Sequence, residues 1–93
     1  METISLILDE PVDFQRAKDA AVRQAEATLE DAILLSWYDK IRDMESPSGV
    51  SECHDACDVP GAVEYAENRG GRLIVNINNG DYLFCYRELD EFA

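Results

Sequence analysis

Basic residues are scarce in this chain. Eight lysines and arginines stand against twenty aspartates and glutamates in 93 residues, and the formal net charge is −12 at pH 7. A nucleic-acid-binding protein neutralises phosphates with clustered Lys and Arg, and an anionic bilayer repels a strongly acidic chain. We therefore expect neither a nucleic-acid partner nor a membrane partner.

Long hydrophobic runs and targeting signals are also missing. Uninterrupted apolar runs, such as residues 32–35, are only a few residues long, whereas a membrane-spanning helix needs about 20 apolar residues. The N-terminus has neither the basic start nor the apolar stretch of a secretory signal. The three cysteines are an odd number, which fits reduced thiols better than a disulfide framework. These features predict a cytoplasmic protein.

What the chain does contain is enough for one folded domain. Hydrophobic residues make up 46% of the sequence, an ordinary globular fraction. The length indicates a single domain over residues 1–93. Residues 40–60 show little periodicity and contain five acids after Arg42 without another basic residue. We expect a long acidic loop there.

Apolar periodicity predicts the regular elements before this loop and directly after it. Short apolar runs at residues 4–8 and 32–39 indicate strands. Apolar residues spaced by three and four over 12–29 indicate an amphipathic helix with an Ala-rich face. Residues 60–68 favour a short helix, although a strand over 62–67 also fits.

Asn79-Gly80 predicts a tight hairpin between the last two strands, because a type I′ turn needs positive φ at both positions. This turn places six apolar residues on one face beneath the long helix: Leu73, Val75, Ile77, Tyr82, Phe84 and Tyr86. The predicted order is β-α-β-α-β-β. It indicates an α+β fold, with a two-layer, four-stranded, largely antiparallel sheet, one long helix on one face and a second short helix.

The opposite face of the hairpin carries Ile74, Leu83 and Cys85. A bare apolar face of this kind seldom remains exposed on a monomer. These three residues are therefore candidates for a homodimer interface.

The segment Cys53-His54-Asp55-Ala56-Cys57 is the one stretch with the residue types of a chemical site. Thiolates and imidazole are preferred zinc ligands, and Cys53, His54, Cys57 and Cys85 form a possible set of four. The adjacency of Cys53 and His54 departs from the usual ligand spacing. A thiol-redox role needs cations that lower a thiol pKa, whereas the neighbours of these cysteines are mainly acidic. An incidental loop is the alternative.

Catalysis has little support in the sequence. His54 with Asp55 or Asp58 forms a possible acid–base pair, but no positioned nucleophile accompanies it. We therefore expect a small acidic binding or protein-interaction module that can self-associate, rather than an enzyme. The alternative is a metal-binding or thiol-redox protein that uses the Cys53-His54-Cys57 segment.

Three stretches carry a resemblance to known proteins: residues 34–39 (LLSWYD), 65–71 (YAENRGG) and 75–82 (VNINNGDY). Together they resemble a small family of uncharacterised prokaryotic proteins of about this length. The resemblance implies a compact α+β domain and no catalytic residues.

Overall fold

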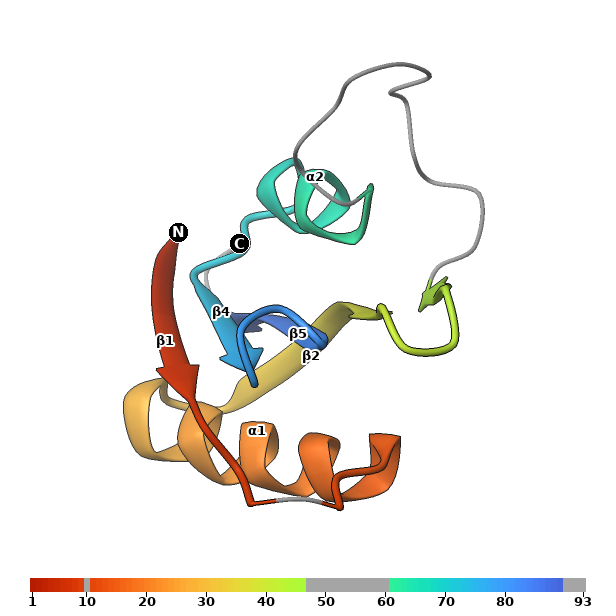
Figure 1. The fold of residues 1–93 in the computed structure, drawn as a ribbon. Helices are drawn as coiled ribbons and strands as arrows, with labels where there is room; N and C mark the ends of the chain where they lie inside the picture. The colour runs from red at the N-terminus through yellow and green to blue at the C-terminus, as the bar shows by residue number, and fades with distance from the viewer. Residues whose placement is uncertain (10, 47–60, 90–93) are drawn as a thin grey trace.

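The structure is a computed structural model that describes residues 1–9, 11–46 and 61–89. In this part of the chain, strands and helices follow in the order β1 (Glu2–Leu6), α1 (Phe14–Thr28), β2 (Ala32–Asp39), β3 (Met44–Ser46), α2 (Gly61–Glu67), β4 (Leu73–Ile77) and β5 (Tyr82–Glu88). The strands form one five-stranded sheet of order β1-β4-β5-β2-β3. Helix α1 covers one face of the sheet and α2 the other (Figure 1).

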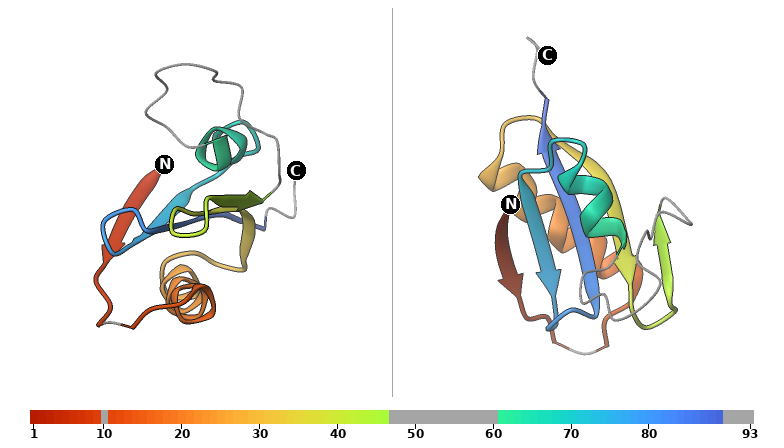
Figure 2. Two further views of the ribbon diagram at one scale, coloured as in Figure 1. Left: turned by 45° about the vertical axis from the view of Figure 1, so that its right-hand side comes forward. Right: turned by 90° about the horizontal axis from the view of Figure 1, so that it is seen from above.

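The predicted α+β class is confirmed, with two differences in detail. The sheet has a fifth strand, β3, which pairs with the end of β2 inside the segment predicted as a loop. The short helix over the predicted residues 60–68 is confirmed as α2, but it lies across the sheet from α1 (Figure 2). The sheet is therefore covered on both faces rather than on one.

The hairpin between β4 and β5 has the predicted register. Leu73 pairs with Tyr86, Val75 with Phe84 and Ile77 with Tyr82. Asn79 and Gly80 have φ values of 57° and 94°, as a type I′ turn requires.

Strand β1 begins and ends two residues earlier than predicted. It runs parallel to β4, and its last residue, Leu6, is paired with Ile77, where β4 itself ends. Beyond that point Leu8 bonds to the side chain of Asn78 instead of continuing the ladder.

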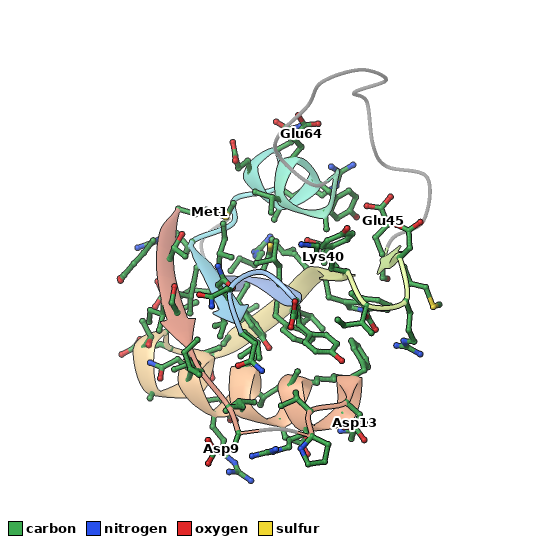
Figure 3. The ribbon with its side chains drawn as sticks, viewed as in Figure 1. Met1, Asp9, Asp13, Lys40, Glu45 and Glu64 are labelled. Carbon is green, nitrogen blue, oxygen red and sulfur yellow. The ribbon has the colours of Figure 1, made fainter. Side chains whose placement is uncertain are left out.

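The main core lies between α1 and the sheet. Ala17, Ala21 and Ala25 are completely buried on α1, and small side chains let the helix approach the strands closely. At its first turn, Phe14 packs 4.6 Å from the ring of Trp37, measured between centroids. Asp13, labelled in Figure 3, caps the helix because its carboxylate accepts a hydrogen bond from the N–H of Arg16 at 2.8 Å.

A smaller core lies between the sheet and α2. Val63 and Ala66 of the helix pack with the completely buried Cys85, and Leu35, Ile74 and Leu83 lie against this group. The hydroxyl of Ser36 on β2 donates to the carbonyl of Ala62 at 2.6 Å. This hydrogen bond joins the start of α2 to the middle of the sheet.

Replacing Ala21 with Leu is expected to lower the free energy of unfolding by about 1–3 kcal/mol, because the added atoms must enter a filled layer between α1 and the sheet. Ala27→Leu is the matched control, since Ala27 is exposed on the same helix, and its effect should stay within about 0.5 kcal/mol. Urea denaturation followed by circular dichroism measures both. Equal effects of the two substitutions would contradict the close packing of α1.

Candidate functional site

A groove of about 700 Å³ opens between α1 and the start of β2. Its lining comes from three places in the sequence: the middle and second half of α1, the turn into β2 with the first residues of that strand, and the end of β5. The lining residues are Lys18, Val22, Ala25, Glu26, Asp31, Ala32, Ile33, Leu34, Tyr86 and Leu89. The buried alanines of α1 pack mainly with β4 and β5. The first residues of β2 therefore lie to one side of the helix, and the groove forms between them.

Tyr86 is the unusual residue of this groove. Its side chain is only 2% exposed, and its hydroxyl is a buried polar atom without a hydrogen-bond partner among the described residues. A buried polar group left unpaired costs about 1–3 kcal/mol. Such a group is rare in folded proteins and points to a partner outside the described residues.

The pKa of Tyr86 is raised, first by burial and then by the charges of Cys85 and Glu26. Glu26 lines the same groove. At neutral pH the phenol is therefore protonated and able to donate a hydrogen bond.

The mouth of the groove is both apolar and charged. Ile33 is 37% exposed and Leu89 is 49% exposed, which is high for large apolar side chains. Glu26 and Asp31 are exposed carboxylates. Lys18 lies about two helical turns before Glu26, or roughly 12 Å along the axis. The acidic end of the groove is thus separated from its single cation.

A second buried polar group, the Asp39 carboxylate at the other end of β2, has hydrogen-bond partners within the chain. Asp39 is completely buried, and its carboxylate accepts hydrogen bonds from the backbone N–H of Arg42 at 3.0 Å and from Nε of Arg42 at 2.6 Å. The Arg42 guanidinium also lies 5.2 Å from the centre of the Phe14 ring. This pair closes the turn between β2 and β3, and we assign it a structural role.

The residues predicted to form a metal or thiol site are not brought together by the described structure. Cys53, His54 and Cys57 lie outside the described residues. Within the described ranges, no group of three or more His, Cys, Asp or Glu side chains is placed to hold a metal ion. The metal site therefore stays a prediction.

Cys85, the fourth member of that set, has the environment of an inert thiol. It is completely buried beneath α2. Burial raises its pKa to about 11, although the neighbouring Ser36 hydroxyl lowers it in part. Metal binding and nucleophilic attack both need the thiolate, which this environment disfavours at neutral pH.

The proposed dimer residues are partly covered by α2. Cys85 is completely buried, while Ile74 and Leu83 are half-buried against the same helix. The expectation of a bare apolar face was wrong for Cys85, because the sequence did not show which side of the sheet α2 would occupy. Self-association stays a prediction that rests on Ile74 and Leu83.

Sequence reasoning missed the groove as a site. The alternation of β5 predicts Tyr86 in the core, where its ring does lie, but it does not indicate what the hydroxyl contacts. The sequence does contain a signal for an unpaired hydroxyl: a tyrosine at an inward-facing strand position, two residues after a phenylalanine. Its hydroxyl must find a partner if the ring is buried.

The chain is a small α+β domain with a mixed sheet between two helices. Comparison with known proteins shows which family it belongs to. Residues 1–86 match the family described as a domain of unknown function (DUF5619), and the chain belongs to this family. The expected resemblance to uncharacterised proteins is thereby confirmed.

One solved structure is similar over almost the whole chain. It is the crystal structure of a novel protein, AF1514, from Archeoglobus fulgidus DSM 4304, with a TM-score of 0.74 and 30% sequence identity. The alignment covers 98% of each chain. No curated protein matches the sequence. Among the described residues, no helix has the length and apolar character needed to cross a membrane.

The raised pKa of Cys85 makes stability depend on pH in a defined window. The thiol has an ordinary pKa of 9.0 and a folded-state pKa of about 11, so the folded chain holds this proton more tightly than the unfolded chain. Stability should therefore fall as pH rises from about 9 to 11, by about 2–3 kcal/mol from this group. The raised pKa values of Tyr82 and Tyr86 act in the same direction.

Urea unfolding at pH 7.5 and at successive values up to 11 measures this dependence. Cys85→Ala isolates the thiol, because the tyrosines remain and only the Cys85 part of the pH dependence is lost. Identical pH profiles for the two proteins would show that the thiol titrates normally in the fold.

Two tyrosines in the same core allow a matched test of the unpaired hydroxyl. Tyr86→Phe removes a group without a described partner and should leave stability unchanged or raise it by about 1 kcal/mol. Tyr82→Phe removes a hydroxyl that donates to the carbonyl of Val12 at 3.4 Å, and should lower stability by about 0.5–1.5 kcal/mol. Chemical denaturation compares the two. A loss of similar size for Tyr86→Phe would mean that its hydroxyl is already satisfied.

Proposed function

We propose that this chain is a cytoplasmic binding domain and that the groove between α1 and β2 is its ligand site. The observation that carries this proposal is the buried, unpartnered hydroxyl of Tyr86 at the groove wall. A phenylalanine there would fill the same core volume without the desolvation cost of the hydroxyl. A ligand that accepts a hydrogen bond from this hydroxyl would explain why the position holds a tyrosine.

The composition of the groove also supports ligand binding. Small-molecule sites are typically concave, with volumes of about 300–1,000 Å³, mostly apolar walls and a few placed polar groups. Here Val22, Ala25 and Leu34 supply apolar wall, and Tyr86, whose hydroxyl has no partner among the described residues, belongs to the same lining. The groove volume of about 700 Å³ falls within that range.

Binding explains this groove better than catalysis does. None of the described residues that line it is a cysteine, serine, threonine or histidine, so the usual nucleophiles and neutral-pH bases are missing from its walls. Glu26 and Asp31 are exposed carboxylates suited to recognising a cation. The cytoplasmic placement is supported by the odd number of cysteines and the strongly acidic composition.

The proposal is tested with a library of small amphipathic amines, amides and alcohols, each added at millimolar concentration to the 15N-labelled protein. Hits should shift the amide signals of Ala25, Ala32 and Leu34, and Tyr86→Phe should weaken their binding about tenfold through loss of the donated hydrogen bond. Tyr82→Phe is the control, because it makes the same chemical change outside the groove lining and should leave affinity unchanged. Hits that gather elsewhere, or that bind Tyr86→Phe equally well, would refute the proposal.

A further inference from the structure

We infer that α2 is a reversible cover over one face of the sheet: it detaches while α1 and the five strands stay folded, and its detachment exposes the thiol of Cys85. This inference concerns the face opposite the groove (Figure 1), so it goes beyond the proposed function and does not depend on it. Its support comes from the separation of the two cores, from the size of the residues that attach α2, and from the glycines at its end.

The two cores are built from different residues, so that one can be lost without the other. The core beneath α1 contains buried residues of α1, β4 and β5. The buried residues of the core beneath α2 are Val63, Ala66 and Cys85, which do not belong to the first group. The ladders that join β1, β4, β5 and β2 are formed by the strands alone. Detachment of α2 therefore leaves these strand pairs and the main core in place.

Helix α2 is short, and its buried residues are small. It has seven residues, whereas an isolated helix shorter than about 12 residues is marginal in water, so α2 depends on the sheet for its stability. Its buried residues are Gly61, Ala62, Val63 and Ala66. Apolar burial stabilises roughly in proportion to the area removed from water, and these side chains supply little area. Detachment of α2 is thus expected to cost less free energy than unfolding of the whole chain.

Ser36 ties the sheet to α2 through a β-bulge. Leu34 is paired with Tyr86 and Ser36 with the adjacent Cys85, so β2 has one residue more than β5 at this point. The extra residue turns Ser36 toward α2, where its buried hydroxyl donates to the carbonyl of Ala62 at 2.6 Å. This hydrogen bond stabilises the attached form of α2.

A pair of glycines, Gly70 and Gly71, lies between α2 and β4. Gly70 has a φ of 79°, and glycine backbones adopt many conformations without steric cost. In the attached form, the N–H of Gly71 donates to the carbonyl of Ala66 at 2.8 Å. A β-carbon at position 71 would lie only 2.8 Å from the same oxygen. The glycine pair therefore permits both the close contact and the hinge motion of α2.

Alkylation of Cys85 by iodoacetamide in the native protein tests the inference. The sulfur–carbon bond forms as the carbon–iodine bond breaks, and the thiol proton passes to solvent. Trypsin then releases residues 73–87, which contain Cys85 alone, while the other two cysteines lie in residues 43–69, so mass spectrometry follows Cys85 separately. Cys85 should be labelled faster than the population of globally unfolded chains allows. Its rate should rise less than about twofold per molar urea, whereas global unfolding would raise it about fivefold per molar.

Three variants separate detachment of α2 from global unfolding. Ser36→Ala should accelerate labelling about fivefold, because the attached form loses a buried hydrogen bond. Ser5→Ala is the matched control, since Ser5 is exposed on β1, and should leave the rate unchanged. Ala21→Leu destabilises the attached and detached forms alike, because both retain the core beneath α1. It should therefore leave the rate within about twofold, whereas labelling through global unfolding would accelerate about fivefold or more.

Three outcomes overturn the inference. The first is labelling of Cys85 with the urea dependence of global unfolding, and the second is acceleration by Ala21→Leu in proportion to its loss of stability. The third is equal labelling of Ser36→Ala and Ser5→Ala, which would show that the Ser36 hydroxyl does not hold α2. Ligand binding in the groove is measured separately, so failure here leaves the proposed function standing.

Discussion

The turn between β4 and β5 is the local constraint on which the rest of the sheet depends. Asn78, Asn79 and Gly80 all have positive φ, between 50° and 94°, a conformation that few residues adopt readily. It fixes the pairing of the two strands, and each strand then positions a neighbour: β5 is bonded to β2 and β4 to β1. The amide of Asn78 also holds Leu8, accepting from its N–H at 2.7 Å and donating to its carbonyl at 3.3 Å. One short turn therefore orders four of the strands.

The same register decides which side chains enter each of the two cores. Alternate residues of β4 and β5 face α1, where Phe84 lies 5.6 Å from the ring of Phe14. The remaining residues face α2, where Cys85 is completely buried. A slip of one residue would exchange the two sets, because side chains alternate along a strand. The exchange would remove Tyr82, Phe84 and Tyr86 from the core beneath α1, so the register is strongly specified.

Most of the fold could be predicted from the sequence, and the failures have physical reasons. Asn79-Gly80 and the alternation around it determine the hairpin locally, and the Ala-rich periodicity of α1 identifies its buried face. Strand β3 was not predicted, because three residues are too few to show the alternation of apolar and polar side chains that indicates a strand. The face covered by α2 could not be deduced, since its short apolar pattern fits either side of the sheet. The groove is a product of tertiary packing between α1 and β2, so no single segment of sequence contains it.

The position of the groove follows from how far the aromatic layer extends along the sheet. Phe84 and Tyr86 are on the same strand and face the same helix, yet only Phe84 lies against the Phe14 ring, at the first turn of α1. Two residues further along β5, the facing residues of α1 are small or charged, namely Val22, Ala25 and Glu26. Small side chains leave room between helix and sheet at that end, where Tyr86 lines the groove. Its hydroxyl is buried and has no hydrogen-bond partner among the described residues, which is difficult to explain by stability alone, because an apolar ring would fill the same space at lower cost.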